Sequence, residues 1–147
     1  MSYVIQAIVA KAGVMRAQVA HVRTVRIGQD LEMAPLTSDL REQLGIPFCP
    51  LTDDDAEVPS LPESIGALCN SLSENGSLAY IEAEIFGGVG MQASAVFRDG
   101  LLAASPVVSD RAINQALRAL GVRAGEHMDE FAAVDLGRFR STDEWVA

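Results

Sequence analysis

Runs of apolar residues mark where the chain is expected to form strands. Residues 3–10 are apolar at nearly every position, which is typical of a strand that is buried on both faces. Residues 24–33 alternate between apolar and polar side chains and bend near Gly28, so they predict a strand or hairpin with one face in water. Residues 77–86 alternate most regularly and predict the clearest strand. We expect the second of these segments to pair with the first.

Glycine-containing turns follow the strand at 77–86. Three glycines between residues 87 and 90 predict a tight turn or bulge that leads into a second strand over residues 91–98. An Asp-Gly pair at 99–100 predicts another hairpin turn, after which residues 101–108 return as a further strand. Successive hairpins of this kind indicate antiparallel pairing.

Apolar residues recur at helical spacing in four other segments. These segments are residues 15–22, 38–44, 60–72 and 110–120. Ser38 or Asp39 is expected to cap the second helix, and Ser60 with Glu63 has the spacing of a capping box for the third. A Ser-Asp pair at 109–110 opens the fourth helix, which has the best-defined apolar stripe.

Together these elements predict an α+β fold with a mainly antiparallel sheet and three to four helices packed on it. The regular strand-helix-strand alternation of a doubly wound sheet is not seen in the sequence. A chain of 147 residues with 49% hydrophobic and 21% charged residues is expected to form one globular domain over residues 1–147.

The charge balance favours some partners over others. Twenty acidic residues against eleven basic ones give a formal net charge of -9, which repels nucleic acid and anionic membranes and attracts a basic protein. The alternative is that the charge only keeps the protein soluble. Residues 47–62 hold four prolines and the acidic run Asp53, Asp54, Asp55 and Glu57, so they predict an exposed acidic loop.

The sequence offers little to bind a metal or a cofactor. Cys49 and Cys69 have no metal-binding spacing with each other or with His21 and His127, so both are expected to be reduced packing thiols. The glycines at 87–90 precede a strand and not a helix, so a nucleotide phosphate site is not expected. Neither a signal peptide nor a membrane span is indicated, which predicts a cytoplasmic location.

Two carboxylates on one strand are candidates for chemistry. Glu82 and Glu84 fall on the same side of the strand, roughly 7 Å apart, beside Tyr80 and Phe86. Paired acid and base catalysis would require one of them in an apolar pocket, whereas the alternative is a solvated strand face. No catalytic residue is assigned.

The tail, residues 137–145, places Arg138, Phe139, Arg140 and Trp145 in an otherwise acidic sequence. Arginine and tryptophan are favoured as anchors of protein interfaces. The alternative is that Phe139 and Trp145 close the core while the two arginines pair with nearby acids.

Two segments carry a resemblance to known proteins. Residues 79–93, AYIEAEIFGGVGMQA, and residues 129–145, DEFAAVDLGRFRSTDEW, resemble a group of small acidic bacterial proteins of unassigned function. These segments cover under a quarter of the chain and bring no catalytic residues with them. In composition the chain also resembles immunity proteins of bacterial toxin systems, which are compact, acidic and cytoplasmic.

These observations favour a non-catalytic binding protein of the immunity type that neutralises a basic bacterial toxin domain. The residues expected to contact the partner are Asp53, Asp54, Asp55, Glu57, Glu82, Glu84, Arg138, Arg140 and Trp145. The alternative is a small enzyme or ligand-binding domain with a pocket near the Gly87–Gly90 hairpin, lined by Tyr80, Glu82, Glu84 and Gln92. A homo-oligomeric structural protein is a third alternative.

Overall fold

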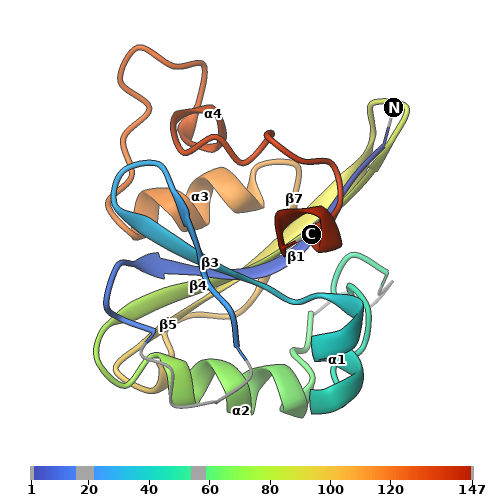
Figure 1. Ribbon diagram of the computed structural model, residues 1–147, viewed down its shortest axis with the longest axis vertical. Helices are drawn as coiled ribbons and strands as arrows, with labels where there is room; N and C mark the ends of the chain where they lie inside the picture. The colour runs from blue at the N-terminus through green and yellow to red at the C-terminus, as the bar shows by residue number, and fades with distance from the viewer. Residues whose placement is uncertain (1, 16–21, 54–58, 147) are drawn as a thin grey trace.

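A computed structural model describes residues 2–15, 22–53 and 59–146 (Figure 1). The strands are β1 (Ser2–Lys11), β2 (Val25–Ile27), β3 (Leu31–Pro35), β4 (Ser77–Phe86), β5 (Val89–Arg98), β6 (Leu101–Leu102) and β7 (Val107–Ser109). The helices are α1 (Ser38–Leu44), α2 (Glu63–Leu72), α3 (Ala112–Ala119) and α4 (Glu130–Ala133), with a 3-10 helix η1 (Thr142–Val146).

One antiparallel sheet organises the molecule. Its strands lie in the order β2-β3-β1-β4-β5-β6, and β7 also pairs with β5. Helices α3 and α4 lie over one face of the sheet and α1 and α2 over the other (Figure 1). The expected α+β fold with an antiparallel sheet is therefore confirmed.

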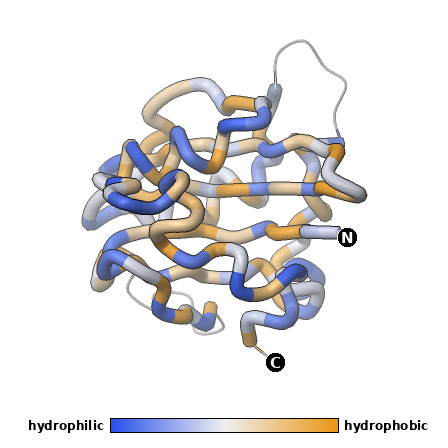
Figure 2. Tube along the Cα trace, turned by 90° about the horizontal axis from the view of Figure 1, so that it is seen from above, coloured by the Kyte–Doolittle hydropathy of each residue, from blue (hydrophilic) through white to orange (hydrophobic). Residues whose placement is uncertain are grey.

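Strand β1 lies at the centre of the sheet because both of its faces are apolar. Ile5 and Val9 belong to the core beneath α3, whereas Ile8 and Ala10 belong to the core over α2. Figure 2 shows the strands side by side, with apolar and hydrophilic stretches alternating along the trace. The expected strand buried on both faces is confirmed, and β3 pairs with it as predicted.

The β4–β5 hairpin is the longest antiparallel pair. Its register runs from Ser77 opposite Arg98 to Phe86 opposite Val89, which leaves a two-residue turn. The turn residues Gly87 and Gly88 have φ of 61° and 80°, and positive φ at both central residues is what a type I′ turn requires. The glycines therefore serve the turn that the sequence predicts.

The strand expected over residues 101–108 is instead broken in two. β6 pairs with the end of β5 at Phe97 and Arg98, and β7 pairs with its middle, from Gln92 to Ser94. Pro106 lies in the break, and a proline has no N–H to donate to the strand ladder.

Three helix starts differ from the sequence expectation. The Thr37 side chain, and not Ser38 or Asp39, caps α1 by accepting the Leu40 N–H. α2 begins at Glu63 with Pro62 as its N-cap and no side-chain cap, so no capping box forms. α3 begins at Ala112, later than the Ser-Asp pair predicts.

The segment expected to be an exposed acidic loop is partly buried. Cys49 and Leu51 are fully buried, because residues 47–53 fold against the sheet and contribute apolar side chains to the core. Residues 54–58 lie outside the described part of the chain. The helix expected over residues 15–22 likewise falls mostly on residues 16–21, which are not described.

Residues 140–146 form a C-terminal strap along the first half of β1. The Val4 N–H donates to the Arg140 carbonyl at 2.8 Å, and Val4 forms a parallel bridge with Ser141. The Gln6 N–H donates to Thr142 Oγ1 at 3.0 Å. Because β3 pairs with β1 only from Ala7 onward, the strap occupies the side of β1 that β3 leaves free.

Candidate functional site

A buried carboxylate fastens the 47–53 segment to the sheet. Glu82 is fully buried, and its Oε1 accepts the backbone N–H groups of Leu51 at 3.0 Å and Thr52 at 2.9 Å. Its Oε2 accepts the hydroxyl of Tyr80, which lies two residues earlier on the same face of β4. Backbone and hydroxyl donors, and no cation among the described residues, therefore surround this carboxylate.

Gln6 extends this buried polar cluster to the neighbouring strand. It lies opposite Glu82 in the β1–β4 pairing. Its Nε2 donates to the Tyr80 hydroxyl and to the Pro47 carbonyl, both at 3.0 Å, and its Oε1 accepts the Cys49 N–H at 3.2 Å. Two side chains of the sheet thus hold both ends of the 47–53 segment.

The cluster has shifted protonation equilibria. Burial raises the pKa of Glu82, and the hydrogen bonds from Tyr80, Thr52 and Leu51 offset only part of this effect. Burial, with the nearby charge of Glu82, raises the pKa of the Tyr80 hydroxyl. Burial likewise raises the pKa of the Cys49 thiol, with the charges of Glu82 and Glu84 adding to it. A thiol held protonated in this way is a packing group and a poor nucleophile.

Two further carboxylates lie at the outer edge of this cluster. Glu84 is partly exposed, and its Oε1 accepts the Thr52 hydroxyl at 3.3 Å. Desolvation raises the pKa of Glu84, and the adjacent negative charge of Asp53 raises it further. Neither carboxylate has an ion pair among the described residues. The fold therefore brings two like charges together at the surface.

Exposed apolar side chains adjoin these carboxylates. Met91 lies opposite Glu84 and Val89 lies opposite Phe86, so all four side chains share one face of the β4–β5 hairpin. Phe86 is 58% exposed, Val89 78% and Met91 40%. We call Asp53, Glu84, Phe86, Val89 and Met91 the hairpin surface.

A pocket of about 470 Å³ lies on the opposite face of the same hairpin. Gly88 and Gln92 of the hairpin line it, together with side chains of β1, α3, α4 and the strap. Tyr80, Glu82 and Glu84 do not line it, because they point to the other face of β4. The expected lining by these three residues is therefore wrong, whereas Gln92 does line the pocket.

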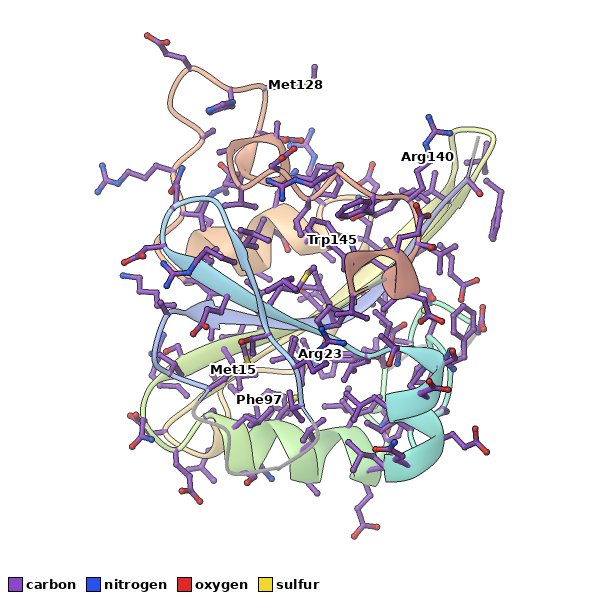
Figure 3. All side chains as sticks on the ribbon, viewed as in Figure 1. Met15, Arg23, Phe97, Met128, Arg140 and Trp145 are labelled. Carbon is purple, nitrogen blue, oxygen red and sulfur yellow. The ribbon has the colours of Figure 1, made fainter. Side chains whose placement is uncertain are left out.

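The remaining predicted site residues are scattered. Arg138 is exposed and pairs with Asp135 at 3.0 Å, whereas Arg140 lines the pocket at its hairpin end (Figure 3). Trp145 is only 7% exposed and packs edge-to-face on Phe139 at 4.9 Å. Asp54, Asp55 and Glu57 lie outside the described residues.

Two of the expected contact residues are misassigned. Glu82 has no exposed surface and Trp145 almost none, so neither side chain can touch a partner directly. Glu82 is buried because the 47–53 segment folds over it. Trp145 is buried because the strap presses its ring into the core under α3.

Sequence reasoning missed Gln6, the residue that links β1 to the covering segment. A single amide in an otherwise apolar strand is a usable signal, because a buried polar side chain needs partners. It also missed Asn114 and Asp129, which join α3 to α4. Asn114 Oδ1 accepts the Phe131 N–H at 2.9 Å, and its Nδ2 donates to Asp129 at 3.3 Å.

Within the described ranges, no three His, Cys, Asp or Glu side chains gather as a metal ion would require. No helix in the same ranges is long and apolar enough to cross a bilayer. Comparison with known protein families, with curated proteins and with solved structures finds no match to this chain. Function therefore has to be argued from the hairpin surface and the pocket themselves.

Proposed function

We propose that this chain is a non-catalytic binding protein of the immunity type, which neutralises a basic bacterial toxin domain. The observation that carries the proposal is the hairpin surface. There the carboxylates of Asp53 and Glu84 lie together, without a cation from the described residues, beside the exposed side chains of Phe86 and Val89.

The two kinds of side chain have different roles in such a contact. Burial of Phe86, Val89 and Met91 against a partner would supply affinity, because exposed apolar area is lost from water. The carboxylates would pair with cationic groups of the partner. A net charge of -9 would speed the encounter with a basic surface and disfavour acidic competitors.

The buried cluster has a positioning role in this proposal. Glu82 holds the N–H groups of Leu51 and Thr52, so it fixes the backbone from which Asp53 reaches the surface. Asp54, Asp55 and Glu57 follow in the sequence and would add to the negative charge. A toxin that acts on cytoplasmic targets would place its immunity protein in the cytoplasm.

The proposal is tested by co-expression. Each open reading frame that flanks the gene is expressed in a bacterial host with and without this chain, and growth is measured. One flanking product should arrest growth alone and lose that effect when the chain is present. If every toxic flanking product remains equally toxic beside the chain, or if none is toxic, the immunity role is wrong.

Charge-reversal variants then test the surface. Asp53→Lys with Glu84→Lys should weaken binding to the identified toxin domain by about tenfold or more, because attraction becomes repulsion. The matched control is the double change Glu63→Lys with Glu74→Lys. Both acids are exposed; Glu63 lies beside β6 and Glu74 precedes β4, at the end of the sheet far from the hairpin turn. Equal effects of the two changes would contradict a role of the hairpin surface.

The alternative expectation, a small enzyme or ligand-binding domain, is favoured by a different observation. The pocket lies on the face of the hairpin opposite to the proposed partner surface. Binding of a ligand there and of a protein on the other face do not exclude each other.

A further inference from the structure

The hairpin pocket is amphipathic. Its apolar wall comes from Ala83 and Ile85 of β4, Ile113 of α3 and the rings of Tyr3 and Phe131, which pack edge-to-face at 5.5 Å. Its volume of about 470 Å³ falls in the range of roughly 300–1,000 Å³ that small-molecule sites occupy.

Most polar groups that line the pocket are already engaged by the protein. The Tyr3 hydroxyl donates to the Leu136 carbonyl at 2.8 Å, and Gln92 Oε1 accepts the Ile113 N–H at 3.1 Å. Asn114 uses its amide oxygen on Phe131 and its amide nitrogen on Asp129. These groups shape the wall, and the Gln92 amide nitrogen stays without a partner among the described residues.

The two charged groups of the pocket differ in this respect. Asp129 caps α4 by accepting the Ala132 N–H at 2.8 Å and also accepts the Asn114 amide, so both of its oxygens are engaged. Arg140 has no ion pair and no side-chain hydrogen bond among the described residues. The neighbouring arginine, Arg138, is paired with Asp135 outside the pocket.

We propose that the hairpin pocket binds a small organic carboxylate with an apolar body. The guanidinium of Arg140 holds the carboxylate, and the body lies against Ile85 and Phe131. The Gln92 amide nitrogen, which has no partner among the described residues, is the second donor toward the ligand.

The chemistry of the lining selects this class of ligand. A guanidinium matches a carboxylate with two parallel hydrogen bonds, whereas an amine would face it with like charge. An anion without an apolar body would leave the apolar wall of the pocket in contact with water. Most of the binding free energy that comes from burying apolar surface would then be lost. The inference does not depend on the proposed protein partner, because the hairpin surface is on the other face.

The test is a titration of the full chain with four matched compounds: octanoate, octanol, octylammonium and acetate. Binding is followed by the amide signals of the 15N-labelled protein, which also locate the site. Octanoate should move the signals of pocket residues such as Gln92 and Gly137 and bind about tenfold more tightly than octanol, since one charge-assisted hydrogen-bonded pair is lost with the alcohol. Octylammonium and acetate should bind more weakly still.

Arg140→Gln should remove the preference for octanoate over octanol, so that the two compounds bind with similar affinity. Arg138→Gln is the matched control, an exposed arginine two residues away that does not line the pocket, and it should keep the full preference. Equal binding of octanoate and octanol by the unmodified chain would overturn the proposal without any variant. So would shifts confined to the hairpin surface, tighter binding of octylammonium, or no binding.

Discussion

Glu82 shows which hydrogen-bond partners a carboxyl group needs when it is buried in the core. The described residues around it supply N–H and O–H donors and no positive charge. A buried carboxylate of this kind is tolerated only while its donors are in place, and those donors would in turn be unsatisfied without it. The two-residue spacing of Glu82 and Glu84 predicted that their side chains share a face of the strand. Their different burial could not be predicted, because it depends on the 47–53 segment that covers Glu82.

Glu82→Ala should therefore destabilise the protein more than Glu84→Ala. The first change leaves the Leu51 and Thr52 N–H groups and the Tyr80 hydroxyl without an acceptor, at about 1–3 kcal/mol for each donor that water cannot reach. The second removes one long hydrogen bond near the surface and should cost about 1 kcal/mol or less. Urea unfolding of both variants measures the difference, and equal losses would contradict the role given to Glu82.

The raised pKa of Glu82 also sets a sign for the dependence of stability on pH. The folded state holds the proton at pH values where the unfolded chain, with a pKa of about 4.3, has released it. The contribution of this group to the free energy of unfolding is then largest at low pH and declines as the pH rises through the folded pKa.

The matching measurement is made in a Glu84→Gln background, because the pKa of Glu84 is raised in the same direction. It compares the protein that carries only this change with the double variant that also carries Glu82→Gln, in which residue 82 cannot titrate. The free energy of unfolding of the single variant, minus that of the double variant, should fall as the pH is raised from about 4 to 7. A difference that rises or stays constant with pH would show that burial does not control this titration.

At the scale of secondary-structure elements, two glycines have opposite surroundings. A Cβ on Gly28, between β2 and β3, would lie 2.8 Å from the Ala133 carbonyl oxygen and 2.9 Å from Val134 Cα. The same backbone approach allows the Gly28 N–H to donate to the Val134 carbonyl at 3.2 Å. A Cβ on Gly66, inside α2, would meet nothing within 4 Å.

Gly28→Ala should lower the free energy of unfolding by about 1–3 kcal/mol, because the hairpin has to move away from the chain after α4. Gly66→Ala should raise it by about 0.5–1 kcal/mol, because alanine loses less conformational freedom in a helix than glycine does. Thermal unfolding of the two variants should thus move in opposite directions. A stabilising Gly28→Ala would mean that this contact is not tight.

Strands with long, regular patterns were predictable from sequence and helix starts were not. The alternation over residues 77–86 predicts β4 with its observed bounds, because successive side chains of a strand point to opposite faces of the sheet. The cap of α1 was misplaced because Thr37, Ser38 and Asp39 stand together at its start and each can cap a helix. The capping box of α2 was wrong because this helix begins directly after Pro62, with no side-chain cap.

Over the whole molecule, the strap links the two ends of the described chain. Trp145 contributes its ring to the core under α3, while the Arg140 carbonyl and Thr142 Oγ1 accept N–H groups of β1. Sequence could not place this segment, because a tryptophan beside arginines is as typical of an interface as of a core. The fold class could be predicted from the order of the strands and helices. The candidate site could not, because it depends on which segments cover the sheet.

Trp145→Ala should lower the free energy of unfolding by about 3–5 kcal/mol, since it removes a large buried ring. Trp145→Phe should cost clearly less, because the indole Nε1 has no hydrogen-bond partner within the described residues and the smaller ring still packs on Phe139. Chemical unfolding measures both. If Trp145→Ala were as stable as the unmodified protein, the ring would be available for a partner after all.

The central position of β1 also has a consequence for synthesis on the ribosome. This strand emerges well before β4, with which it pairs from Ser2 opposite Phe86 to Ala10 opposite Leu78. Until β4 has left the exit tunnel, the nascent polypeptide carries an apolar segment that lacks its main neighbour. Chaperones bind such an exposed apolar segment, and other nascent chains can aggregate with it. Synonymous codon changes that slow translation before codon 77 should therefore increase the insoluble fraction of the product.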